Sequence, residues 1–178
     1  MPDDLVAALH LAVCRRFGEA VRAAHGGWGR RSPCEEWDAR AVLEHVIGFH
    51  DVLILRPLGL KPDRPRDDPQ ARWQLTYDAL TAAVESGRLS QLREYSLMPN
   101  LTRDVLVHTW DLARAVGADD VLDSAWCRRF YDGLPADPRA LSSSRMFSVP
   151  IAVPDESDVQ AKLLARLGRD PSWRPETA

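Results

Sequence analysis

Apolar residues recur every three or four positions along most of this 178-residue chain, and nowhere do they alternate long enough to predict a β-sheet. Glycines and prolines of the kind that end helices separate the periodic segments. Four principal helices and two shorter ones are therefore expected, at residues 3–25, 38–56, 69–85, 102–117, 122–131 and 157–167. Residues 133–157 are expected to be mostly loop, with 149–153 at most a short extended piece. We predict an all-α fold, a four-helix bundle with short additional C-terminal helices.

The size and composition of the chain fit one domain over residues 1–178, because 45% apolar residues suffice for one core. A net charge of −3 supplies no basic field for nucleic acid or anionic lipid, so neither is expected as a partner. The acidic stretch MPDDLVAALH does not resemble a signal peptide, and no apolar run reaches the roughly 18 residues of a membrane span. A soluble, cytoplasmic protein is expected. Three widely spaced cysteines without a CxxC pair indicate reduced thiols rather than disulfides or a cysteine zinc site.

A histidine lies in the apolar stripe of the expected helix TRDVLVHTWDLARAVG, residues 102–117. At about 100° per residue, His108 falls on the apolar face of this helix. That face also contains Leu101, Val105 and Leu112. Asp104 lies at its edge, about 40° from His108. Because residues four apart lie one above the other on a helix, the carboxylate and the imidazole can point at a common object.

The second expected helix carries two further histidines. Its apolar stripe comprises Val42, Val46, Phe49 and Leu53, and its solvent face comprises Arg40, Glu44 and Asp51. His45 and His50 flank the stripe on opposite sides, about 140° apart, so they cannot easily reach one ion together.

These positions allow two interpretations. A metal site would combine Asp104 and His108 with either His45 or His50. Two imidazoles and a carboxylate suit a divalent ion such as Zn²⁺, and three protein ligands leave a coordination position open for catalysis. In the alternative, the histidines are core residues whose ring nitrogens are satisfied by hydrogen bonds. Helical spacing alone leaves both interpretations open.

Three stretches, read together, resemble the metal-binding domain of mycothiol-dependent maleylpyruvate isomerase and its actinobacterial relatives, a branch of the DinB-like four-helix bundles. They are SPCEEWDARAVLEHVIG (32–48), DVLVHTWDLARAVGADDVLD (104–123) and the tail from VPIAVP to LLARLGRDPSW (149–173). The first is similar to a Pro-Cys-x-x-Trp stretch followed by a helix with a ligand histidine. The second is similar to the family's carboxylate-x₃-His-x-Trp-Asp-Leu-Ala run.

The resemblance implies a DinB-like bundle with His45, Asp104 and His108 as metal ligands, and so selects His45 over His50. The acidic ligand is Asp here, whereas the family usually has Glu, which is longer by one methylene. The resemblance further implies a divalent metal ion, Zn²⁺ before Ni²⁺, and a mycothiol-type thiol as co-substrate. Isomerase activity is not carried over, because the isomerase continues into a second domain.

A thiol S-transferase acting on a small-molecule substrate is the function that follows. A bound metal favours the thiolate, which is the nucleophile. Two other hypotheses remain: a non-catalytic bundle that binds metal or an apolar ligand, and a metal-free structural bundle. The oligomeric state, including a homodimer, stays open.

The roles of several other residues are also left open. Asp111 either orients a ligand histidine or forms a surface pair with Arg114. Cys34 is expected to be a small buried hydrophobe, and His50 a packing or hydrogen-bonding residue. Arg169 either recognises a carboxylate-bearing thiol or lies at a solvated helix end, which is the expected case.

Overall fold

A computed structural model describes residues 3–35, 37–143 and 147–175, and within them the chain is all-helical, with no β-strand. This confirms the predicted all-α fold. The four longest helices are α1 (Asp3–Ala23), α2 (Ala39–His50), α3 (Pro69–Glu85) and α4 (Met98–Val116). The shorter helices α5 (Ser124–Asp132), α6 (Ala140–Ser143) and α7 (Val159–Arg166) follow, and residues 149–153 are loop rather than an extended strand.

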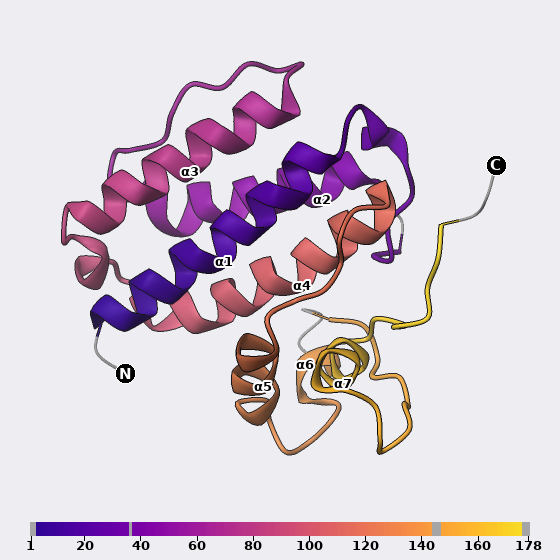
Figure 1. Cartoon of the computed structure of the whole chain (residues 1–178). Helices are drawn as coiled ribbons and strands as arrows, with labels where there is room; N and C mark the ends of the chain where they lie inside the picture. The colour runs from indigo at the N-terminus through magenta and orange to yellow at the C-terminus, as the bar shows by residue number, and fades with distance from the viewer. Residues whose placement is uncertain (1–2, 36, 144–146, 176–178) are drawn as a thin grey trace.

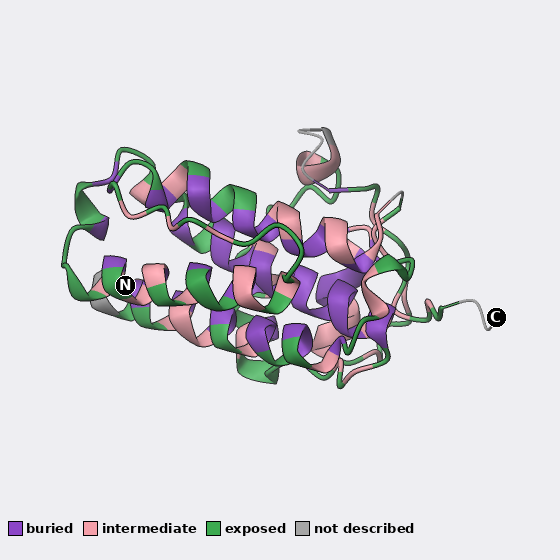
Figure 2. Cartoon of the chain, turned by 90° about the horizontal axis from the view of Figure 1, so that it is seen from above, coloured by how far each residue is buried: buried purple, intermediate pink, exposed green. Residues whose placement is uncertain are grey.

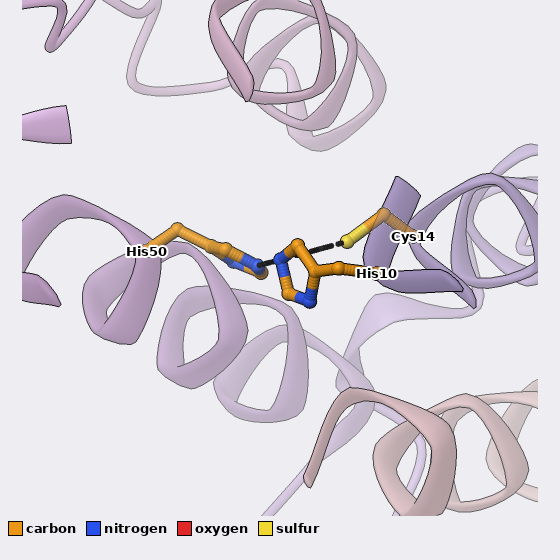
Figure 3. A group of neighbouring side chains, drawn as sticks. All are labelled: His10, Cys14 and His50. Carbon is orange, nitrogen blue, oxygen red and sulfur yellow. Dashed lines mark hydrogen bonds between the residues drawn. The ribbon is translucent and has the colours of Figure 1, made fainter. Parts of the chain in front are cut away.

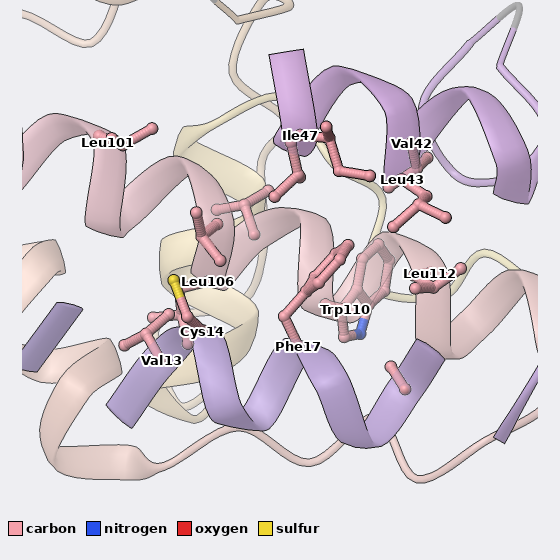
Figure 4. Close-up of a cluster of buried hydrophobic side chains, with 14 of the residues drawn as sticks. Val13, Cys14, Phe17, Val42, Leu43, Ile47, Leu101, Leu106, Trp110 and Leu112 are labelled. Atoms are coloured by element: carbon pink, nitrogen blue, oxygen red, sulfur yellow. The ribbon is translucent and has the colours of Figure 1, made fainter. Parts of the chain in front are cut away.

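The four longest helices lie side by side (Figure 1) and pack around one apolar core. Helices α1 and α2 each contact both α3 and α4, and the contacts between α1 and α4 are the most extensive. Side chains from α1, α2 and α4 interdigitate in the middle of this core, with Phe17 and Trp110 fully buried (Figure 4). Buried residues line the facing sides of the helices, whereas exposed residues lie on their outer sides (Figure 2).

Helix boundaries follow local signals in the sequence. Asp38 caps α2 at the predicted start of this helix, because its side chain accepts a hydrogen bond from the Ala41 amide. Gly117 ends α4 with a φ of 74°, a left-handed conformation that glycine adopts without steric cost. Helix α4 starts before residue 102, the predicted start, and has Pro99 in its first turn. Proline is tolerated there because the first N–H groups of a helix make no helical hydrogen bond.

The second helix continues beyond His50 as a π-helical turn, η2 (Asp51–Leu55). The prediction that Asp51 faces solvent is wrong. The loop after this turn folds back over the helix, and Arg64 donates two hydrogen bonds, of 3.0 and 2.7 Å, to the buried Asp51 carboxylate. Phe49, predicted in the apolar stripe, is 43% exposed.

Helix α4 is buried around most of its circumference rather than along one stripe. Helices α1 and α2 cover part of it, and residues 167–173 of the C-terminal segment cover another part through Arg169 and Arg114. No helix of the described residues is long and apolar enough to cross a membrane.

Candidate metal centre

The structure brings His45, Asp104 and His108 together between α2 and α4. The His45 Nε2 atom lies 3.3 Å from Asp104 Oδ2, and the His108 Nε2 atom lies 3.6 Å from Asp104 Oδ1. The three ligand atoms all lie within 4.8 Å of one another. Ligand atoms of a tetrahedral zinc ion, with bonds of about 2.0–2.1 Å, lie about 3.3 Å apart. The group could therefore hold a metal ion with small side-chain adjustments.

His108 presents one specific nitrogen to this group. Its Nδ1 donates a 2.9 Å hydrogen bond to Asp111 Oδ2, a carboxylate that is fully buried. The neutral ring then carries its proton on Nδ1, and the lone pair of Nε2 faces Asp104 and His45. A carboxylate behind the distal nitrogen is the usual way in which proteins fix a metal-binding histidine.

Asp111 is itself held by Arg169, from the segment after α7. The guanidinium donates from Nε to Asp111 Oδ1 at 2.9 Å and from Nη2 to Oδ2 at 3.0 Å. Burial alone would raise the pKa of Asp111, but Arg169 and the hydrogen bond from His108 outweigh it and lower this pKa below its usual value. Asp111 therefore stays ionised inside the protein.

The structure decides between the two alternatives for Asp111, and the prediction for Arg169 is wrong. Asp111 makes no surface pair with Arg114, which instead pairs with Asp120 and donates to the Trp173 carbonyl. Arg169 does not lie at a solvated helix end but is buried, because it closes over Asp111. Of the two roles considered for Asp111, the structure supports the one in which it orients His108.

The Asp104 carboxylate is short of hydrogen bonds. Its Oδ2 atom is buried and has no hydrogen-bond partner among the described residues, although His45 Nε2 lies 3.3 Å from it. Burial would raise the pKa of Asp104, but the neighbouring His108 and His45 outweigh it and lower this pKa. A buried, ionised carboxylate with one imidazole beside each of its oxygens suits a cation site. Although Asp is one methylene shorter than Glu, it reaches both rings.

A cavity of about 820 Å³ opens beside these three residues. Its walls are largely apolar and include Trp37, Phe49, Leu53, Leu97, Leu101, Phe147 and Val149. The ring centroid of Trp37 lies 4.6 Å from that of His45 and 5.7 Å from that of His108, so one aromatic side chain packs against both imidazoles. This volume lies within the usual range of small-molecule sites, roughly 300–1,000 Å³.

Cys34 also lines the cavity. It is only half-buried, contrary to the prediction, and its Sγ atom lies 3.5 Å from Arg169 Nη2. Burial nevertheless raises the pKa of the Cys34 thiol to about 11, despite the nearby guanidinium. This cysteine is a neutral thiol near pH 7.

A second group of potential ligands, His10, Cys14 and His50, lies between α1 and α2 (Figure 3). The predicted hydrogen-bonding role of His50 is confirmed, because its Nδ1 donates to the Val46 carbonyl at 2.7 Å. The partners of His10, Thr102 and His50, were not predicted from the sequence. The spacing of four between His10 and Cys14, which places them on one face of α1, was the available signal.

Comparisons of the chain with protein-family models, with curated proteins and with solved structures give no match.

Proposed function

We propose that this protein is a DinB-like helical bundle that binds one divalent metal ion through His45, Asp104 and His108. Zn²⁺ suits the ligand set best, with Ni²⁺ as the alternative. We further propose that it transfers a small thiol of the mycothiol type to a small-molecule electrophile. The observation that carries the proposal is the Nε2 lone pair of His108, fixed by Asp111 and directed at the unsatisfied Asp104 carboxylate.

The ligand number favours a catalytic over a structural ion. Structural zinc sites are usually closed by four protein ligands, whereas three protein ligands leave a position for a substrate. The three residues lie at the wall of an 820 Å³ cavity, so a small molecule can reach that position. A divalent ion there would lower the pKa of a coordinating thiol and so supply the thiolate nucleophile.

The protein's own cysteines do not supply such a nucleophile. Burial raises the pKa of Cys34 to about 11 and that of Cys127 to about 12, and it raises the pKa of Cys14 still further. All three are protonated near neutral pH, so the reactive sulfur would come with a co-substrate. The chain's contribution is to orient His108 through Asp111 and to line the site with Trp37 and the other apolar walls.

Elemental analysis tests the metal claim on protein purified without chelators or nickel resin. We expect His45→Ala to bind one equivalent of metal fewer than the wild type. His25→Ala is the matched control, because His25 lies in the turn after α1, outside both groups of ligands. This variant should bind as much metal as the wild type. Equal metal content in wild type and His45→Ala would refute the site.

The transferase claim needs a separate assay. Metal-loaded protein is incubated with mycothiol and a panel of electrophiles, and S-conjugates are measured by mass spectrometry against the metal-free protein and His45→Ala. Conjugates formed only by metal-loaded wild type support the proposal. Stoichiometric metal without any conjugate would instead identify a non-catalytic metal- or ligand-binding bundle.

A further inference from the structure

A second compact group of potential ligands lies in the core and comprises His10, Cys14 and His50. It differs from the first site because it contains a sulfur atom. The three side chains are at most 1% exposed. His10 Nε2 lies 3.1 Å from His50 Nε2, and Cys14 Sγ lies 3.6 and 3.7 Å from these two nitrogens. Figure 3 shows the three atoms converging from α1 and α2.

The hydrogen bonds around this group leave it short of protons. His50 Nδ1 faces the Val46 carbonyl at 2.7 Å, and a carbonyl can only accept, so His50 carries its proton there. Thr102 Oγ1 donates its own proton to the Met98 carbonyl at 2.7 Å. It can therefore only accept from His10 Nδ1, at 2.9 Å.

Both neutral imidazoles then direct Nε2 lone pairs at each other across 3.1 Å. The one proton left among the three facing atoms is that of the Cys14 thiol, a weak donor. An additional proton between the rings would place a charged imidazolium in the core, where these side chains are at most 1% exposed and an unpaired charge is costly. One weak donor cannot satisfy two facing lone pairs in a core, whereas a cation can satisfy both.

We propose that His10, Cys14 and His50 bind a second metal ion, a thiophilic one, and that a univalent ion such as Cu⁺ fits the site best. The three separations place a point about 2.0 Å from all three atoms, close to the roughly 2.0–2.3 Å bonds that imidazole and thiolate form with such ions. Thiolate with imidazole selects copper and zinc over harder cations.

Charge distinguishes between these two metals. One thiolate and two neutral imidazoles carry one negative charge, so Cu⁺ makes a neutral site and Zn²⁺ leaves one positive charge in the core. Two carboxylates act on His50, but Asp104 lies between the imidazoles of the first site and Arg64 already pairs with Asp51, so neither is free to offset that charge. A buried uncompensated charge is costly, so the neutral site is favoured.

The backbone next to His50 supports a ligand role. The π-helical turn η2 starts at the residue after His50. Such turns are rare and frequently occur at functional sites in helices.

Refolding in the presence of metal tests the proposal, since the buried site has to be filled as the helices assemble. Metal-stripped protein is refolded with one equivalent of Cu⁺, Zn²⁺ or Co²⁺, without added thiols. Binding is followed by the near-ultraviolet thiolate-to-metal charge-transfer band and by competition with a chromophoric chelator. His45, Asp104 and His108 offer no sulfur themselves, and comparison with Cys34→Ser excludes a contribution from Cys34, which lines the cavity beside them.

We expect the band at one equivalent, tightest for Cu⁺, and unchanged in His45→Ala. Loss of an outer hydrogen-bond partner alone weakens metal sites by up to about 100-fold, so Cys14→Ser should abolish the band and weaken binding at least that much. Cys127→Ser is the matched control, a second buried cysteine outside the group, and should keep the band. Tighter Zn²⁺ than Cu⁺ binding would overturn the choice of metal.

Absence of the band in the wild type with all three ions, or its survival in Cys14→Ser, would overturn the proposal. If circular dichroism shows that Cys14→Ser does not fold, the double variant Cys34→Ser/Cys127→Ser decides, because it leaves Cys14 as the single thiol. If the double variant folds but does not show the band, the site is refuted. These results are independent of metal binding by His45.

Discussion

Replacing Asp111 by Asn tests the link between the core of the protein and its candidate metal centre. Asn keeps the volume and one acceptor, but it removes the charge that neutralises Arg169, whose side chain is 6% exposed. Removing one partner of a buried ion pair costs about 3–5 kcal/mol, and the retained acceptor puts Asp111→Asn near the lower end, about 3 kcal/mol. Loss of the carboxylate behind His108 should also weaken metal binding by about 10–100-fold.

The double variant Asp111→Asn/Arg169→Met separates these two effects. Met removes the unpaired charge and fills similar space, so we expect most of the lost free energy of unfolding to return. Metal affinity should stay low, because His108 still lacks its carboxylate. Urea denaturation of the metal-free proteins measures the first quantity, and chelator competition measures the second. The proposed connection would be refuted if stability and metal affinity both recover in the double variant. It would also be refuted if Asp111→Asn lowers neither quantity.

Three further predictions concern stability. In metal-free protein the pKa of Asp111 is lower in the folded state than its unfolded value near 3.8, so the ionised carboxylate stabilises the fold above that pH. The free energy of unfolding, measured by urea denaturation, should fall as acid protonates Asp111, and it should fall less in Asp111→Asn. The same decrease at low pH in both proteins would contradict this. An alanine in a left-handed conformation lowers the free energy of unfolding by about 1–2 kcal/mol, and Gly117→Ala, which has open space around it, should lose only that amount. Gly168→Ala should lose more, because its Cβ would lie 2.7 Å from backbone atoms of Ser148. Equal losses in the two variants would show that this clash is relieved. Arg64→Met leaves the buried Asp51 carboxylate unpaired and should cost about 3 kcal/mol by denaturation; a loss below 1 kcal/mol or so would mean that water reaches the carboxylate.

The elements that local chemistry defines were predictable from the sequence. Helix caps such as Asp38 and the left-handed Gly117 act on residues only a few positions away. The periodicity of apolar residues is likewise a pattern among near neighbours in the sequence. The proximity of Asp104 and His108 followed from their spacing of four on one helix. Spacing could not choose between His45 and His50; the resemblance selected His45, and the structure places it beside Asp104.

Contacts made by distant segments escaped the sequence argument. Arg169 lies 58 residues after Asp111, and no periodicity links an inter-helix side chain to a loop that folds over it. The same holds for the burial of Asp51 by Arg64 and for the partners of His10, which lie on other helices. In each case a polar residue expected at the surface or without a partner is buried, because another segment brings the complementary group.

Because Arg169 pairs with Asp111, the candidate metal centre can be completed only late in synthesis. All three proposed ligands and Asp111 leave the ribosome before Arg169 does. A nascent chain that ends earlier can form α1 to α4, but it lacks the cation that keeps the Asp111 carboxylate buried behind His108. Metal capture should therefore come late in biosynthesis, and a protease that cuts the connection between α5 and α7 should release bound metal while the four long helices remain folded.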